Sequence, residues 1–328
     1  MPATEAVSAS QEERAGIPLD ELAAIVALDA VRGFGPGAFR GLHDAHLTPA
    51  QLLADPAALP MDGKRAETLR RAIAAITDAD RELATHRAAK QISRAAELGI
   101  RLITYSHGPY PKNLLASNNA LPVLSARGDL SVIDEVDVVA CVGSRAIRAP
   151  YDDYLARFAA RAVSEGWVVA SGFATGADTI AHTAAVRAGG RTLLVMPSGL
   201  DIPFPPENRE LWHAWLERPG VCAISEFPLG TKASALQLRK RNKTTVGVAR
   251  AVVVGQSSLK GGTMNAYRFA REQRKPVLAF SADRRNDTSG NRKIEAEEAE
   301  QLELAESYDG AHVYPLLKAW LNEASSST

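Results

Sequence analysis

From Arg101 onward, short apolar runs alternate with amphipathic stretches, and this alternation constrains the fold more than any other feature of the sequence. The β-rich runs occupy residues 101–105, 136–143, 167–172, 192–199, 222–227, 250–256 and 276–282. Helical periodicity occurs between them, over residues 150–165, 177–189, 207–217, 234–247 and 263–274. Alternating strands and helices of this kind predict an α/β fold, in which a parallel sheet carries helices on both faces.

The chain before Arg101 has a different periodicity of apolar residues. Apolar residues recur at helical spacing from Leu19 to about Ile92 and are interrupted by Pro and Gly, so about four or five short helices are expected. We therefore divide the chain into a disordered lead-in, a small all-helical domain, the α/β domain, and a C-terminal helix with its tail. Their predicted boundaries are residues 1–17, 18–95, 96–310 and 311–328.

The composition excludes several classes of protein. Because 38 Lys and Arg balance 38 Asp and Glu, any preference for anions must arise locally. The two cysteines, Cys141 and Cys222, lie in apolar surroundings, which argues against a disulfide framework and places both in the core. The N-terminus lacks an apolar signal core, and no stretch of about 18 apolar residues occurs. We therefore expect a cytoplasmic protein that does not enter membranes.

Glycine and small polar residues follow four of the predicted strands. These strand ends read Gly143-Ser144-Arg145, Ser171-Gly172-Phe173-Ala174-Thr175-Gly176, Pro197-Ser198-Gly199-Leu200-Asp201 and Lys260-Gly261-Gly262-Thr263. Ligands of open parallel sheets bind at the carboxyl ends of the strands, and glycine lets an anion approach the backbone there. The loops therefore predict a groove for phosphate groups. GxGxxG and GxxxxGKS/T are both missing, so neither a dinucleotide site nor a P-loop is indicated.

Four cations crowd into the five residues from Arg239 to Lys243. One interpretation is a phosphate clamp, in which these side chains meet a nucleic-acid backbone and Asn242 adds a directed hydrogen bond. Arg145 and Lys260 would be neighbours in the same groove. The other interpretation is a solvated helix start, which is what most charge runs are. The neighbouring glycine-rich strand ends favour the clamp.

Other polar and aromatic residues receive structural interpretations. Asp178 and His182 are too few for a metal site, so we expect Asp178 to hold a loop by hydrogen bonds and His182 to pack behind it. Trp212 and Trp215 share one predicted helix and are expected in the core or at an interface. The loop residues Phe173 and Phe204 are better candidates for stacking on bases.

Several segments, in order, resemble motifs of the DNA processing protein A family, also called DprA or Smf, in the SLOG superfamily. The segments that carry the resemblance are PYPKNLLASNNALPVLSARGDL, CVGSRAIRAPY, VVASGFATGADTIAH, PSGLDIPFPPENREL, SEFPLGTKASALQLRKRNK and SGNRKI. Near the N-terminus, LDAVRGFGPGAFRGLHD is similar to the family's helical domain of the SAM or helix-hairpin-helix kind.

The resemblance implies a Rossmann-like fold and a single-stranded DNA-binding protein rather than an enzyme. Such a protein works without cofactor or metal and loads a RecA-type recombinase during natural transformation (competence) and DNA recombination. A homodimer is expected, and the chain has no room after residue 307 for the winged-helix module of many members. The residues expected to bind DNA or phosphate are Gly143, Ser144, Arg145, Ser171, Gly172, Phe173, Gly176, Arg239, Lys240, Arg241, Asn242, Lys243, Lys260, Gly261, Gly262, Thr263 and Asn291.

Two departures from the family pattern keep alternatives open. Lys243 stands where the family has a second Arg, and Lys260-Gly261-Gly262-Thr263 replaces its Ser-Gly-Ser. One alternative is therefore a SLOG-type nucleotide-binding sensor or enzyme, including a specialised paralogue in phage defence. Another is a protein-interaction module that uses the helical domain.

Overall fold

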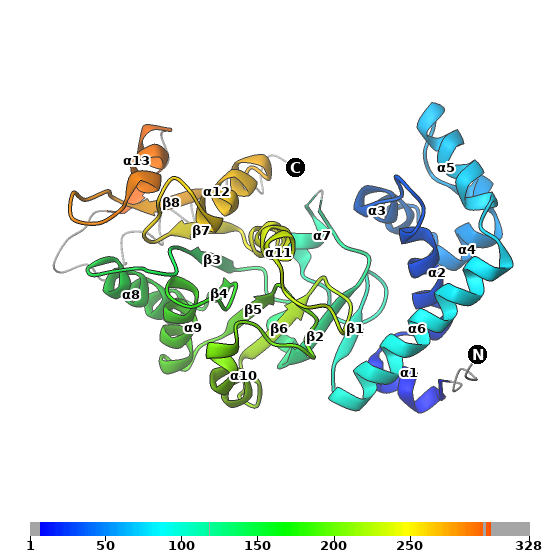
Figure 1. Ribbon diagram of the computed structural model, residues 1–328, viewed down its shortest axis with the longest axis horizontal. Coiled ribbons are helices and arrows are strands. Elements are labelled where there is room, and N and C mark those ends of the chain that lie inside the picture. The colour runs from blue at the N-terminus through cyan, green and yellow to red at the C-terminus, as the bar shows by residue number, and fades with distance from the viewer. Residues whose placement is uncertain (1–6, 118, 298–299, 303–328) are drawn as a thin grey trace. The chain divides into compact units, whose positions relative to one another are not determined.

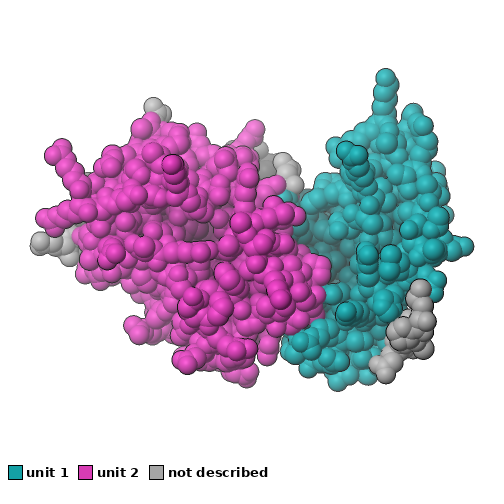
Figure 2. Space-filling view, viewed as in Figure 1, with its two compact units in different colours: residues 1–110, 118–126 teal, residues 111–117, 127–328 magenta. Residues whose placement is uncertain are grey.

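The computed structural model describes residues 7–117, 119–297 and 300–302, and it divides into two compact units, coloured separately in Figure 2. The first unit comprises residues 1–110 and 118–126, and the second comprises residues 111–117 and 127–328. The C-terminal helix predicted over residues 311–328 lies outside the described residues, as do residues 303–310 of the predicted α/β domain.

The first unit is built mainly from helices. They are α1 (Ala9–Ala15), α2 (Leu19–Asp29), α3 (Pro36–Asp44), α4 (Pro49–Ala54), α5 (Lys64–Ala74) and α6 (Asp78–Leu98), with a short 3₁₀ turn at Pro56–Ala58. Three of the helix starts are capping boxes, in which Ser8 pairs with Gln11, Thr48 with Gln51 and Thr77 with Asp80. Each box satisfies backbone N–H groups that a helix leaves without a partner, so the sequence itself fixes where these helices begin.

The predicted disordered lead-in is wrong for residues 9–15, which form α1. Ser8 caps this helix, because its hydroxyl accepts from the backbone N–H of Gln11 and the Gln11 side chain accepts from the backbone N–H of Ser8. The apolar residues Ala15 and Ile17 are buried. The polar composition of the segment concealed both the capping box and these two anchors.

The division between the units also differs from the predicted boundary at residue 95. Helix α6 continues to Leu98 and ends at Gly99, whose φ of 63° is a left-handed conformation that favours glycine. The strand β1 (Arg101–Ile103) then pairs antiparallel with Leu124–Ala126 of β2 (Leu124–Gly128), within the first unit. The strand predicted at 101–105 is therefore confirmed, but its assignment to the parallel part of the sheet is wrong.

Seven parallel strands form the centre of the second unit. In spatial order they are β6 (Val221–Ser225), β5 (Thr192–Met196), β4 (Val168–Ser171), β3 (Val138–Val142), β7 (Ala251–Val254), β8 (Val277–Phe280) and β9 (Glu300–Leu302). Every residue of the strands from β3 to β8 is buried, as their continuous apolar sequences predict for strands covered on both faces.

Helices cover both faces of this sheet, as Figure 1 shows. Helices α8 (Tyr151–Ser164) and α9 (Ala177–Arg187) pack on one face, while α11 (Ala235–Gly247) and α12 (Gly262–Glu272) pack on the other. The remaining helical segments are α7 (Lys112–Leu115), α10 (Arg209–Leu216), α13 (Ser289–Ala296) and 3₁₀ turns at Leu130–Val132 and Pro206–Asn208. The predicted α/β architecture with a Rossmann-like sheet is therefore confirmed.

His182 of α9 is fully buried against the sheet. Its Nδ1 atom lies 2.7 Å from the hydroxyl oxygen of Thr192 on β5, and its ring packs beside Phe173 and Trp215. Burial lowers the pKa of His182 to about 3, and the nearby positive charge of Arg241 acts in the same direction. The imidazole is therefore neutral in the folded protein, which confirms the packing role predicted for it.

The low pKa makes stability depend on pH. In the unfolded chain the imidazole takes up a proton below about pH 6.5, whereas the folded protein resists protonation down to about pH 3, so its stabilising contribution is lost as the pH falls through this window. We expect the stability advantage of the wild type over His182→Gln to shrink by about 2 kcal/mol between pH 7 and pH 4.5. Urea unfolding followed by circular dichroism measures both proteins, and an advantage independent of pH would contradict the assignment.

Candidate functional site

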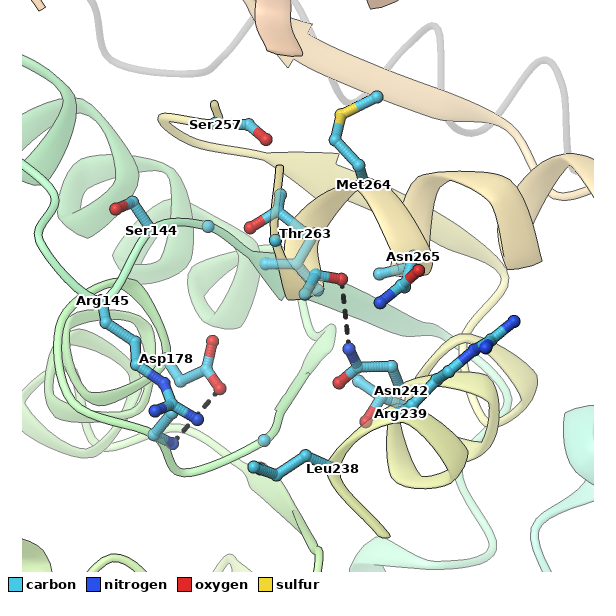
Figure 3. A pocket seen from close by; sticks show the side chains of 18 of the residues that line it. Ser144, Arg145, Asp178, Leu238, Arg239, Asn242, Ser257, Thr263, Met264 and Asn265 are labelled. Carbon is cyan, nitrogen blue, oxygen red and sulfur yellow. Dashed lines mark hydrogen bonds between the residues drawn. The ribbon is translucent and has the colours of Figure 1, made fainter. Parts of the chain in front are cut away.

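An open groove of about 700 Å³ lies at the carboxyl ends of β3, β4 and β7 (Figure 3). Its walls come from the loops after these strands and from the facing parts of α11 and α12. Eleven of the residues predicted from the sequence line it: Gly143, Ser144, Arg145, Gly172, Arg239, Arg241, Asn242, Lys260, Gly261, Gly262 and Thr263. Loops far apart in the sequence thus meet at one edge of the sheet, because parallel strands all end there.

Arg241 lies beneath the groove, and only 4% of its surface is exposed. Its guanidinium group donates hydrogen bonds to the carbonyl oxygens of Gly172, after β4, and Val195, in β5, the latter at 2.9 Å. The carboxylate of Asp178 lies 3.9 Å away. A buried guanidinium must be satisfied in this way. Arg241 therefore has a structural role in place of the predicted direct contact with phosphate.

Asp178 is the partner that balances this buried charge. Burial raises the pKa of Asp178 above its ordinary value, while the positive charge of Arg241 opposes the rise. The carboxylate also accepts a hydrogen bond of 3.2 Å from the backbone N–H of Ala174. The predicted role of Asp178, to hold its loop by hydrogen bonds, is confirmed.

Asn242 joins α11 to the start of α12. Its side-chain nitrogen donates to the carbonyl oxygen of Gly262 at 3.1 Å, and its side-chain oxygen accepts from Nε of Arg241 at 3.1 Å (Figure 3 shows the first bond). One end of α12 is thereby fixed to the same helix that carries Arg241. The predicted directed hydrogen bond of Asn242 is made within the protein.

The glycines of the groove fall into two groups. A Cβ atom on Gly172 would overlap the Arg241 guanidinium group, and one on Gly143 would lie 2.7 Å from the Cβ of Ala177. These two glycines therefore allow the loops to pack together. A Cβ atom on Gly261, by contrast, would meet no other atom of the described residues within 4 Å, and the φ of Gly261 is 146°. Among the glycines that line the described groove, Gly261 is therefore the one that leaves most room for a ligand to approach the backbone.

Four exposed cations face the groove: Arg145, Arg239, Lys260 and Arg268. In Figure 3, Arg145 comes from one side, while Arg239 comes from the other, on α11. The first turn of α12 also lines the groove, and the N–H groups of a first helical turn have no partner within the helix. Because Asp178 is balanced by Arg241, the groove is a positively charged surface suited to anions.

Arg268 is the groove cation that the sequence interpretation missed. It lies four residues after Met264 on α12, and both side chains line the groove because residues spaced by four share one helix face. Its Nη2 atom donates to the Asn265 side chain at 2.6 Å. Helical spacing from Gly261, seven residues earlier, could have identified it.

Two predicted cations do not line the groove. Lys240 and Lys243 lie near Glu226, where both positive charges oppose the rise that burial causes in the pKa of this carboxylate. Glu226 also accepts a hydrogen bond of 2.6 Å from the Thr244 hydroxyl. The basic run is therefore divided among different faces of α11, and among its four cations only Arg239 and the buried Arg241 line the groove.

Four other residues predicted to bind DNA instead make packing contacts or hydrogen bonds within the protein. Phe173 is fully buried and packs against Trp212 and Trp215, so the prediction that it stacks on bases is wrong, while the core position of both tryptophans is confirmed. The hydroxyl of Ser171 donates to the carbonyl oxygen of Cys141 at 2.6 Å, and Gly176 lies in close contact with the Arg145 backbone.

Asn291 is the fourth of these residues. It is buried, donates to the carbonyl oxygens of Gly255 and Phe280 at 2.7 and 2.8 Å, and accepts from the N–H of Ser257 at 2.8 Å. It thereby fixes the loop between β7 and α12. Phe204 is half-buried and is not among the described residues that line the groove.

Within the described part of the chain, no group of three or more His, Cys, Asp or Glu side chains could hold a metal ion. None of its helices is long and apolar enough to cross a membrane. Both cysteines are buried in the core, as predicted. The chemistry that the groove offers is therefore that of cations, backbone N–H groups and hydroxyls placed around an anion.

Removal of Arg241 should destabilise the fold rather than merely weaken the groove. Arg241→Ala leaves the Asp178 carboxylate and two carbonyl oxygens buried without their partner, so we expect the free energy of unfolding to fall by about 3–5 kcal/mol. Arg239→Ala, two residues earlier on the same helix, removes an exposed side chain and should change stability by less than about 0.5 kcal/mol. Urea unfolding of both variants tests this, and equal stabilities would contradict the anchoring role.

Comparison with known proteins identifies the family. The family model of DNA recombination-mediator protein A matches residues 101–309. Among curated proteins, the chain is 30% identical to protein Smf of Synechocystis over 183 residues, which is 55% of this chain and 46% of that protein. It is also 30% identical to DNA processing protein DprA of Bacillus subtilis over 183 residues, covering 56% of this chain and 61% of that protein. The alignments thus span about half the length of these relatives.

Solved structures agree on the fold. The X-ray structure of DNA processing protein A from Streptococcus pneumoniae aligns with a TM-score of 0.68 and 22% identity, covering 88% of this chain and 95% of that one. DNA processing protein A from Helicobacter pylori aligns with a TM-score of 0.59 and 22% identity, covering 67% of this chain and 96% of that one. Because the family model covers more than half of the chain, including every strand and loop of the groove, this protein belongs to the DNA recombination-mediator protein A family.

Proposed function

We propose that this protein binds single-stranded DNA in the groove and acts as a recombination mediator. The observation that carries the proposal is the convergence of four exposed cations and the start of α12 on one open groove. Phosphate contacts of this kind give affinity for any sequence and a strong dependence on salt. Family membership supports the same interpretation, and the Helicobacter pylori relative is described by its mode of binding single-stranded DNA.

In this proposal, one set of residues contacts phosphate and a second set positions the loops of the groove. Arg145, Arg239, Lys260 and Arg268 neutralise phosphates, and the N–H groups at Gly262 and Thr263 donate to one phosphate. Arg241 and Asn242 hold the loops and α12 in place from below. Because binding of this kind makes and breaks no covalent bond, the protein acts as a binding protein rather than as an enzyme.

The wider role follows from the family. In this proposal, a cytoplasmic homodimer protects single-stranded DNA and passes it to a RecA-type recombinase during DNA uptake or repair. The transfer is tested by the ATPase activity of such a recombinase on DNA coated with single-strand-binding protein. We expect the protein to shorten the lag before ATP hydrolysis begins, and an unchanged lag would contradict the mediator role.

Two lysines provide a matched test of the binding site. Lys260 lines the groove and Lys240 does not, although both are exposed. We expect Lys260→Ala to weaken binding of a labelled oligo-dT by about threefold and to reduce the slope of log affinity against log salt by about 0.7, the contribution of one phosphate contact. Lys240→Ala should change neither. Fluorescence anisotropy across a salt series measures both quantities.

The possible outcomes separate the alternatives. Absence of oligo-dT binding by the wild type at low salt would overturn the single-stranded DNA proposal. Equal losses in the two lysine variants would show that Lys240 contributes as much as Lys260, and would contradict the assignment of binding to the groove. Stronger binding to duplex DNA than to oligo-dT would contradict the preference for unpaired strands.

A further inference from the structure

A second groove runs along α12 and adjoins the first. The first groove lies at the start of α12, and the second lies between α12 and α13. Leu259, Met264 and Arg268 line both grooves, so the two form one continuous surface. From Met264 to Arg271 the helix advances by about 10 Å, which is the distance over which the second groove follows it.

Positive charge continues along this second groove. Arg268 and Arg271 of α12 and Lys293 of α13 line it, together with the single carboxylate of Glu297. Glu297 is already engaged, because it accepts hydrogen bonds from Lys293 and from the hydroxyl of Tyr267. Arg271 is exposed and has no ion-pair partner within 4.0 Å in the described part of the chain. Arg268 pairs with Glu272 at 4.0 Å and Lys293 pairs with Glu297, so the positive charge of Arg271 is the surplus that favours an anionic ligand.

Two apolar side chains, Leu259 and Met264, lie beside Arg268 where the two grooves meet, and they are called the apolar ridge here. Leu259 is 53% exposed, and with Met264 it lines the place where the grooves meet. A single exposed leucine is ordinary on a protein surface, but this one stands between two sets of cations. An unpaired nucleic-acid strand presents apolar base faces next to phosphates, whereas a duplex hides its base faces in the stack. The alternation of charged and apolar surface therefore matches an unpaired strand.

We propose that single-stranded DNA leaves the first groove across Leu259 and Met264 and continues into the groove between α12 and α13. Arg271 neutralises a phosphate there, and the apolar side chains of Leu259 and Met264 contact a base at the crossing. This inference rests on the proposed binding of single-stranded DNA in the first groove. The inference adds the path that the DNA strand follows beyond the first groove, and a second set of contacts along that path.

Dependence on oligonucleotide length tests the path, because a short strand fills the first groove alone. Arg271→Ser should weaken binding of the whole chain to an oligo-dT of about sixteen nucleotides by about threefold, while binding of about four nucleotides stays unchanged. The matched control is Arg187→Ser, since Arg187 is also an exposed arginine in the last turn of its helix but lies outside both grooves. It should alter neither affinity.

A second comparison tests the ridge. We expect the wild type to prefer oligo-dT over an abasic strand of equal length, and Leu259→Ser to lose about fivefold of that preference without a change in salt slope. Leu83→Ser, at a leucine 48% exposed in the first unit, serves as control and should keep the preference.

The outcomes distinguish this inference from the proposed function. If Lys260→Ala weakens binding but Arg271→Ser and Leu259→Ser do not, the first groove binds DNA and the path across α12 is wrong. If the wild type binds no oligo-dT, both proposals fall together. If Arg271→Ser instead abolishes binding of an acidic protein partner and leaves every oligonucleotide unaffected, the second groove is a protein interface and the inference is overturned.

Discussion

The groove depends on one buried interaction, the contact of Arg241 with the carbonyl oxygens of Gly172 and Val195 above the Asp178 carboxylate. A guanidinium group withdrawn from water is stable only when its hydrogen bonds are satisfied. Those partners belong to the loop after β4, to β5 and to α9. A single side chain from α11 therefore sets the spacing of the strand ends, and the adjacent Asn242 extends this control to α12.

This arrangement explains how a chain with no net charge can present a strongly basic surface. The charge of Arg241 is offset by Asp178 within the core. Arg241 therefore holds the loops of the groove in place and does not itself bind the ligand. Arg145 lies close enough to lower the pKa of the Arg241 guanidinium further, after the larger effect of desolvation. Of the exposed cations around it, Arg268 pairs with Glu272 at 4.0 Å, whereas Arg145, Arg239 and Lys260 have no such carboxylate in the described lining, so their electrostatic field acts on a ligand in the groove.

Much of the fold could be predicted because its signals are local. Alternating apolar runs and helical stretches predicted the parallel strands and the helices between them, and the continuous apolar character of each run predicted burial on both faces. The helix at 9–15, the strands β2 and β9, and the antiparallel pairing of β1 were missed. The signals for these elements are a capping box within a polar segment and two strands, LSARG and EQL, that lack a continuous apolar run and are therefore weakly specified by local patterns.

The sequence by itself determined that the glycine-rich segments end at one edge of the sheet, since they follow parallel strands. Among the described residues, three of the four predicted loops line the groove, whereas the loop at residues 197–201 does not. Only the tertiary structure decided which side chains face the groove. Arg239, Lys240, Arg241 and Lys243 look equivalent in the sequence, yet one is exposed to the groove, one is buried beneath it and two lie near Glu226. The reason is geometric: each helical residue turns by about 100°, so adjacent cations point to different faces, and packing against the sheet selects among them.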